Sequence, residues 1–488
     1  MQVDEIKEQN GECASDSAEE NKAGMAGKPD ESSDASVVDP NDLSVRKASV
    51  GELLKNAFPL IISQASMSFL ALADTYFMGW IGPEAQAAVG FGGQSVFCLL
   101  SLFFGLISGL TTFVSQYFGA KRHSDCGKML WHMLYLAVGL GILCAIFMGP
   151  LVDLMLTAMG TNPDIFDVTS EYMTVRLWAC PIMFTAFTFL SFLRGIGNIR
   201  TQLIVAILVV VANIPLTYIF AFGLGPIPAF GVAGAAIGTV IAQGLEMLLY
   251  GSVVMKRKNA LQFATRRMVK PVLSAYANIA KVALPVGAAW AIENWGWLVY
   301  NLYITTLPKE QAAANAIVQV FMYVAWTPGL AISIATTMMV GQYMGAKNIK
   351  SAEKSAHYAI IMSIVCLLSL GIMMFILRYV IAEAFSDDAV VVDIAVKLFY
   401  FAIAYQIFDA AGVTTSGALR GAGDTRFPML ICFIGIWGVM LPMMFILDYV
   451  YNLEIYGAWI ASSAAIILCG CLYFARFVRG KWKTMFVE

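Results

Sequence analysis

Apolar stretches of about twenty residues or more recur along the chain from about residue 50 onward, and short polar connections separate them. Each stretch is long enough to cross the roughly 30 Å hydrocarbon core of a bilayer as an α-helix. The predicted spans are 55–81, 88–117, 128–152, 170–193, 201–224, 231–255, 278–304, 314–343, 355–380, 393–417, 428–450 and 456–478. The pattern therefore predicts an all-α membrane protein with twelve transmembrane helices.

The composition agrees with this class. Hydrophobic residues make up 59% of the chain and charged residues 13%, whereas soluble domains contain about 25% charged residues. Residues 1–48 differ from the rest, because they contain twelve acidic residues, five basic residues and no aromatic residue. Such a segment buries too little apolar surface to offset chain entropy. We expect a disordered tail rather than a signal peptide, since no basic start leads into an apolar stretch.

Lysine and arginine are concentrated in alternate connections, which predicts that this side of the membrane is cytoplasmic. We therefore expect both termini in the cytoplasm, with 256–277 as a cytoplasmic loop and 481–488 as a short tail. The main exceptions on the opposite side are Arg176, Lys309, Arg378 and Lys397.

The two halves of the chain repeat each other at an offset of 226 residues. The segment 114–121 (VSQYFGAK) matches 340–347 (VGQYMGAK), and Leu-Arg-Gly at 193–195 matches the same tripeptide at 419–421. Six spans in each half are an even number, so both halves run in the same direction through the bilayer. We expect two pseudosymmetric six-helix lobes, 49–255 and 278–480, with the substrate between them near the midplane.

Three acidic residues, Asp74, Glu293 and Asp409, lie well inside predicted spans. A carboxylate at that depth is costly and indicates a functional site, because a buried acid can exchange a proton or trade it for sodium. The repeat places Tyr300, Met67 and Met183 at the equivalent positions, so the acids break the symmetry. The alternative is that hydrogen bonds hold the acids in a purely structural role.

Other site chemistries find little support. No Walker motif is present, and neither the three histidines nor the nine cysteines have metal-ligand spacing, so we expect no cofactor and reduced cysteines that pack in the core. The basic runs lie next to spans, where lipid headgroups explain them better than nucleic acid. An enzyme would need a paired-acid or histidine-rich motif that the sequence lacks.

Three motifs near span ends, QYFGAK at 116–121, LRGIGN at 193–198 and LRGAGDTR at 419–426, resemble the multidrug and toxic compound extrusion (MATE) family, in particular its NorM-like branch. The resemblance covers about 50–480. It implies two six-helix lobes around a V-shaped cavity. It also implies export of cationic or amphipathic organic compounds, driven by inward Na⁺ or H⁺ flux.

The resemblance also implies roles for single residues. Asp74 corresponds to the ion-binding acid of the N-terminal lobe, and the polar partners of that acid correspond to Asn213, Thr217 and Thr239. Some relatives carry a second acid where this chain has Thr217, which leaves the coordination open; a buried threonine can also bond to its own helix. Glu293 and Asp409 resemble the acid pair of the C-terminal lobe, which is linked to ion coupling and drug competition.

Aromatic residues accompany these two acids. Tyr405 precedes Asp409 by one helical turn, and Trp290 and Trp297 share the helix face of Glu293. An aromatic face can hold an organic cation, so we predict substrate contacts here. Packing or anchoring at the membrane interface is the alternative for the tryptophans.

We therefore predict a monomeric antiporter of the cell membrane. A flippase for a lipid-linked saccharide is the nearest alternative, although its cavity would need basic groups for a diphosphate. A passive channel is a further alternative. The sequence leaves the substrate and the choice between Na⁺ and H⁺ open.

Overall fold

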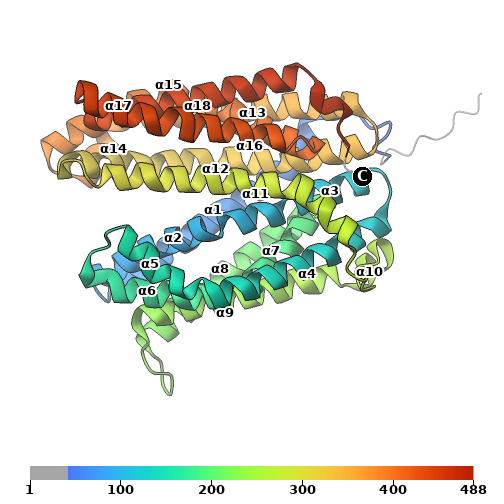
Figure 1. Cartoon of the computed structure of the whole chain (residues 1–488), viewed down its shortest axis with the longest axis horizontal. Helices are drawn as coiled ribbons and strands as arrows, with labels where there is room; N and C mark the ends of the chain where they lie inside the picture. Colours follow the sequence, from blue (N-terminus) through green and yellow to red (C-terminus); the bar gives the residue numbers. More distant parts are fainter. Residues whose placement is uncertain (1–41, 487–488) are drawn as a thin grey trace, which may run out of the picture. The chain divides into compact units, whose positions relative to one another are not determined.

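The computed structural model describes residues 42–486, and these residues form helices without any β-strand (Figure 1). The first ten helices are α1 (Val50–Gly79), α2 (Pro83–Ser108), α3 (Leu110–Gly119), α4 (His123–Phe147), α5 (Gly149–Ala158), α6 (Pro163–Trp178), α7 (Cys180–Gly195), α8 (Ile199–Phe222), α9 (Gly231–Val254) and α10 (Arg257–Phe263). The others are α11 (Leu273–Ile304), α12 (Lys309–Gly345), α13 (Ile349–Ile376), α14 (Arg378–Phe385), α15 (Ala389–Ala422), α16 (Arg426–Phe433), the π-helix η1 (Ile434–Met440), α17 (Leu441–Tyr451), α18 (Glu454–Val478) and the 3₁₀-helix η2 (Lys481–Thr484).

The predicted spans fall on these helices. Within residues 42–486, eleven helices are long and apolar enough to cross a membrane, counting α2 with α3, and α16 with η1 and α17, as continuous spans. The remaining predicted span, 170–193, is the pair α6 and α7, which is bent by 54°. The bend has a local cause, because Pro181 in the first turn of α7 has no N–H to continue the helix from α6.

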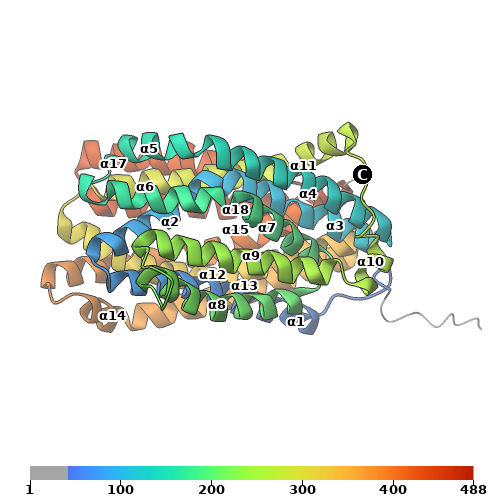
Figure 2. The ribbon, with the colours of Figure 1, turned by 90° about the horizontal axis from the view of Figure 1, so that it is seen from below.

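The repeat appears directly in the packing. In the N-lobe, α1–α9, helix α1 packs on α8 and also on α12 of the other lobe. In the C-lobe, α11–α18, helix α11 packs on α16 and also on α2 of the N-lobe. These contacts correspond to each other under the repeat. Figure 1 shows the two sets of helices side by side, and Figure 2 shows that helices of both sets run along the same direction.

The first helix of each lobe contributes side chains to the hydrophobic core of the other lobe. Ile279 and Ala283 in the first half of α11 belong to the N-lobe core, and Leu53 and Ala57 in the first half of α1 belong to a C-lobe cluster. The first helix of each lobe is thus partly packed in the other lobe, so any rearrangement of the lobes must involve α1 and α11.

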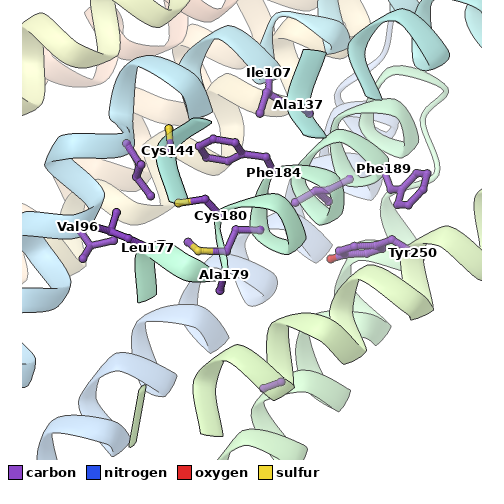
Figure 3. Close-up of a cluster of buried hydrophobic side chains, with 14 of the residues drawn as sticks. Val96, Ile107, Ala137, Cys144, Leu177, Ala179, Cys180, Phe184, Phe189 and Tyr250 are labelled. Carbon is purple, nitrogen blue, oxygen red and sulfur yellow. The ribbon is translucent and has the colours of Figure 1, made fainter. Parts of the chain in front are cut away.

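The bend between α6 and α7 places side chains of both helices in the N-lobe core. Figure 3 shows Leu177 of α6 and Cys180 and Phe184 of α7 together with Cys144 of α4. All four are buried. The eight cysteines among residues 42–486 are unpaired, and most are buried, as expected of packing residues.

Hydrogen bonds hold residues 42–46 in place before α1. Asn348 Nδ2 donates to the carbonyls of Leu43 (3.0 Å) and Arg46 (2.9 Å). Lys121 Nζ donates to Asp42 Oδ2 (2.9 Å), and this bond lowers the pKa of the Asp42 carboxyl to about 2. The predicted disorder is therefore wrong for 42–48, because the C-lobe and Lys121 hold this segment; the rest of the predicted tail lies outside the described residues.

The other end of the chain returns to the same region. Trp482 is buried and donates from Nε1 to Phe477 O (2.9 Å), and Lys483 Nζ lies 2.7 Å from Glu353 Oε1 at the start of α13. Asn348, which holds the first described residues, is the N-cap of the same helix. Both ends of the described chain therefore lie at one end of the helices, and the assignment of this end to the cytoplasm stays a prediction.

Asp424 ties the end of α15 to α18. Its carboxylate is 4% exposed and lies 2.8 Å from Arg476 Nε. We expect Asp424→Asn to lower the free energy of unfolding by about 2–3 kcal/mol, because the substitution leaves a half-buried guanidinium unpaired. Thermal unfolding in detergent measures this effect. Asp393→Asn, which breaks the exposed Asp393–Lys397 pair, is the control, with an expected loss of at most about 1 kcal/mol; equal losses would contradict the prediction.

Candidate functional site

The four residues predicted for the N-lobe ion site meet in one place. Asp74 of α1 is 7% exposed, and its carboxyl oxygens accept hydrogen bonds from Thr217 Oγ1 of α8 (3.0 Å) and Thr239 Oγ1 of α9 (3.3 Å). Asn213 Oδ1, one turn before Thr217, lies 3.2 Å from the Thr217 hydroxyl. Three helices therefore converge on one carboxylate. The role of these residues in coupling stays a prediction.

Each threonine hydroxyl of this Asp74 cluster has two acceptors. Thr217 reaches Asp74 and Asn213, and Thr239 Oγ1 reaches Asp74 and, at 2.9 Å, the carbonyl of Ala235. A hydroxyl has one proton, so it donates to one acceptor at a time and can turn a lone pair toward a cation. The cluster can hold a proton on Asp74 or surround Na⁺ with oxygen atoms, the ligands that hard cations prefer.

The charge of the site suits a monovalent ion. Across residues 42–486, no three His, Cys, Asp or Glu side chains are grouped as metal ligands. Asp74 contributes one negative charge, and its hydrogen-bond partners are neutral. A divalent or transition-metal site would ordinarily use several charged or soft ligands.

Arg176 of α6 is a functional candidate that the sequence analysis missed. It lies within electrostatic range of Asp74, and its Nε and Nη1 atoms are buried without a hydrogen-bond partner among the described residues. The signal was present in the sequence, because Arg176 is a basic residue on the side of the membrane that otherwise has few. Its positive charge competes with any cation that binds Asp74.

We expect Arg176→Gln to raise the ion affinity of the Asp74 cluster about fivefold, because removing a charge at this range is worth about 1 kcal/mol. The concentration of Na⁺ or H⁺ that gives half-maximal transport would fall accordingly. Arg378→Gln is the matched control, since Arg378 stacks on Phe375 in the C-lobe, far along the chain from this cluster. An unchanged half-maximal concentration in Arg176→Gln would remove Arg176 from the site.

The two predicted acids of the C-lobe interact electrostatically. Glu293 of α11 and Asp409 of α15 are both half-buried and lie within electrostatic range of each other. Neither carboxyl group has a hydrogen bond from another of the described residues. Two carboxylates in range of each other repel when both are ionised, so a proton or a cation stabilises the pair.

The aromatic residues near these acids divide into two groups. Tyr405 is buried and lies in electrostatic range of Asp409 and of Tyr300, and the Trp297 ring centroid is 5.3 Å from that of Tyr300. Trp290 instead packs against α2, because a Cβ atom on Gly105 would lie 2.9 Å from Trp290 Cγ. Tyr300 was missed as a site residue, although it is the repeat equivalent of Asp74. Substrate contacts at Tyr405, Trp290 and Trp297 stay predictions.

The repeated Leu-Arg-Gly motif places one arginine near an acid in each lobe. Arg194 Nε donates to Gln202 Oε1 (2.9 Å) and lies in range of Glu246 in α9. Arg420 Nη2 donates to Ser333 Oγ (3.2 Å) and lies in range of Glu293. Glu246 was not singled out from the sequence, although it lies well inside the predicted span 231–255.

Two hydrogen bonds related by the repeat join the lobes at the end of the helices that carries the motifs. Gln116 Nε2 of α3 donates to Gly421 O (2.9 Å), and Gln342 Nε2 of α12 donates to Gly195 O (2.9 Å). Both donors and both acceptors are repeat equivalents. This pair of hydrogen bonds is named the clasp.

Two glycines make the clasp possible. A Cβ atom on Gly119 would overlap the carbonyl oxygen of Gln342, and a Cβ atom on Gly345 would overlap that of Gln116. The Gln-x-x-Gly part of the repeated motif therefore allows α3 and α12 to approach each other closely. Any separation of the two lobes at this end of the molecule would break both hydrogen bonds of the clasp.

Comparisons with known proteins agree with the repeat and the fold. The MatE family model matches residues 59–219 and 285–446, two stretches that begin 226 residues apart. A protein of Thermotoga maritima named probable multidrug resistance protein NorM is 28% identical over 88% of this chain and 93% of its own length. A Bacillus subtilis protein named probable multidrug resistance protein YoeA is 27% identical over 87% of this chain and 92% of its own length.

Solved structures show the same architecture. The crystal structure of the eukaryotic MATE transporter AtDTX14 has a TM-score of 0.80 at 19% identity and covers 89% of this chain and 96% of its own. A MOP superfamily transporter from Pyrococcus furiosus has a TM-score of 0.81 at 21% identity and covers 91% and 98%. The predicted fold of two six-helix lobes is confirmed.

Proposed function

Because the chain belongs to the MatE family, we propose that it is a multidrug exporter that exchanges cationic or amphipathic organic compounds for Na⁺ or H⁺. The observation that carries this proposal is the Asp74 cluster, in which threonine hydroxyls of α8 and α9 lie against one buried carboxylate and the Asn213 amide oxygen lies beside Thr217. Such a site can take up and release a monovalent ion, as coupled transport requires. The names of the NorM and YoeA relatives support organic compounds as the transported class.

In the proposed cycle the described structure is the state with a closed clasp. An ion binds at the Asp74 cluster, and organic substrate and ion compete at Glu293 and Asp409 beside the Tyr405 ring. The reciprocity of linkage requires that substrate weakens ion binding by the same free energy by which the ion weakens substrate binding. Opening of the clasp would then expose the sites to the opposite side of the membrane.

The setting of this cycle is also proposed. The chain is a multi-pass membrane protein, and bacterial NorM relatives favour the inner membrane. We place both termini in the cytoplasm, on the side where basic residues are concentrated. We propose a monomer, since each lobe contributes its own acids and one chain contains both.

The test is transport in proteoliposomes. Export of a fluorescent organic cation would be followed under an imposed Na⁺ gradient and, separately, under a pH gradient, for the wild type and for Asp409→Asn. Movement that follows one gradient and is lost in the variant would identify the coupling ion. Asp393→Asn, on the same helix as Asp409 but exposed, is the matched control. Transport by Asp409→Asn at the wild-type rate would remove that acid from the mechanism.

A flippase for a lipid-linked saccharide is less well supported. Its cavity would need free positive charges for a diphosphate, but three of the arginines inside the helices lie in range of a carboxylate. The pairs are Arg176 with Asp74, Arg194 with Glu246 and Arg420 with Glu293. Transport of the fluorescent cation at a rate that depends on neither the Na⁺ gradient nor the pH gradient would favour the flippase or a passive channel.

A further inference from the structure

A cavity of about 490 Å³ lies where α11, α15, α16 and α18 end or begin at the clasp end of the C-lobe. Three basic side chains line it: Lys281 of α11, Arg426 at the start of α16 and Arg476 near the end of α18. Its acidic residue is Asp424. Neither the ion site nor the clasp uses these residues.

The charge of the cavity is positive after internal pairing. Asp424 is committed to Arg476 Nε, whose guanidinium also lies 4.6 Å from the centroid of the Phe427 ring. Neither Lys281 nor Arg426 has an ion-pair partner within residues 42–486. The cavity also faces the N-terminal end of a helix that continues from α16 through η1 to Tyr451, where the helix dipole favours an anion.

The cavity continues into an apolar surface. Phe427, Leu430 and Met485 contribute apolar side chains to its lining. Further along the same helix, Phe433 and Trp437 are exposed at helical spacing from Leu430. A cationic pocket at the end of a membrane span, followed by exposed apolar side chains along that span, has the two chemical features of a phospholipid-binding site.

The site is specific to the C-lobe. The repeat retains the first two cations, with Lys55 equivalent to Lys281 and Arg200 equivalent to Arg426. The third cation is replaced by Tyr250, which is buried in the N-lobe core. Arg476 is thus present in the C-lobe only, so the repeated fold does not require a cation at this position.

We propose that this pocket binds the phosphate group of an anionic phospholipid, with an acyl chain along Leu430, Phe433 and Trp437. The phosphate contacts Lys281, Arg426 and the nitrogen atoms of Arg476 that Asp424 leaves free. The apolar surface favours a lipid over free phosphate. The lipid would join α11, α16 and α18 at the end of the molecule where the lobes are held together.

The test uses the purified full chain in detergent after removal of bound lipid. Native mass spectrometry and thermal unfolding would compare phosphatidylglycerol, phosphatidylcholine and inorganic phosphate. The wild type should retain phosphatidylglycerol in preference to phosphatidylcholine, with a matching rise in Tm. Lys281→Gln/Arg426→Gln should weaken this binding about twenty-five-fold, because each basic residue near the headgroup adds about fivefold.

Lys350→Gln/Lys354→Gln is the matched control, since it removes two charges from exposed sites outside the cavity. The control should bind phosphatidylglycerol as the wild type does. Equal losses in both double variants would show non-specific attraction and overturn the proposal, as would unchanged binding in Lys281→Gln/Arg426→Gln. Stabilisation by inorganic phosphate that equals the effect of the lipid would identify a soluble anion instead. If the double variant were not monodisperse, Arg426→Gln would provide the same comparison.

Discussion

Asp74→Asn is expected to abolish gradient-driven export while the protein still folds. Asparagine has the shape of aspartate, and Thr217 can donate to Asn213 in place of Asp74, so the packing of α1 on α8 is retained. The lost attraction for a cation is about 4 kcal/mol at 4 Å in a partly buried site, or about a thousandfold in affinity. Ion-driven uptake of a fluorescent cation and the heat of Na⁺ or proton binding measure the effect.

Graded variants separate charge from geometry at this site. Thr217→Val removes one oxygen and keeps the carboxylate, so ion affinity should fall only about tenfold. Asp74→Glu keeps the charge and should restore part of the transport. Asp153→Asn, at an exposed acid bound to Ser170, is the control and should transport normally. Ion-driven export by Asp74→Asn at more than about a tenth of the wild-type rate would show that coupling depends on the C-lobe acids instead.

Gly119→Val and Gly345→Val should each force the clasp open and reduce transport more than about tenfold. The added side chain meets a backbone carbonyl oxygen of the other lobe, which cannot rotate away as a side chain can. Overpacking of this kind costs about 1–3 kcal/mol, enough to reduce the ratio of closed to open molecules by about fivefold to more than a hundredfold. Because the two positions are repeat equivalents, both variants should have the same effect.

Spin labels can report the clasp directly. Ser124→Cys and Lys350→Cys are exposed repeat equivalents next to α3 and α12, and the distance between labels at these positions should increase in both glycine variants. The background would lack the natural cysteines. Gly139→Val is the matched control, since open space surrounds that position. Unchanged label distances together with normal transport would show that this contact is not a gate.

The broad architecture was accessible from the sequence because it depends on features that repeat. Span length and the 226-residue offset predicted the helices and the lobes. One predicted span, 170–193, differs in the structure, because it is bent at Pro181. The contact between Asp74, Thr217 and Thr239 was less accessible. Those residues are far apart along the chain, and their grouping followed only from the resemblance to relatives.

Other features could not be predicted from local pattern. The packing of α1 in the C-lobe and of α11 in the N-lobe depends on how whole helices pack. It could not be predicted, because an apolar residue has the same appearance in the sequence whichever lobe it faces. Arg176 and Glu246 were overlooked because a charge in a span shows its role only when its partner on another helix is known. The order of residues 42–48 depends on Asn348, about 300 positions away.

The clasp has the geometry of an interface between two identical subunits. Each half contributes the same donor and receives the bond at the same acceptor, which is the defining property of an isologous contact. A surface of this kind is self-complementary, so a polypeptide with six spans and this motif could pair with a second copy of itself. The chain thus has the form of a fused homodimer whose two halves carry different acids.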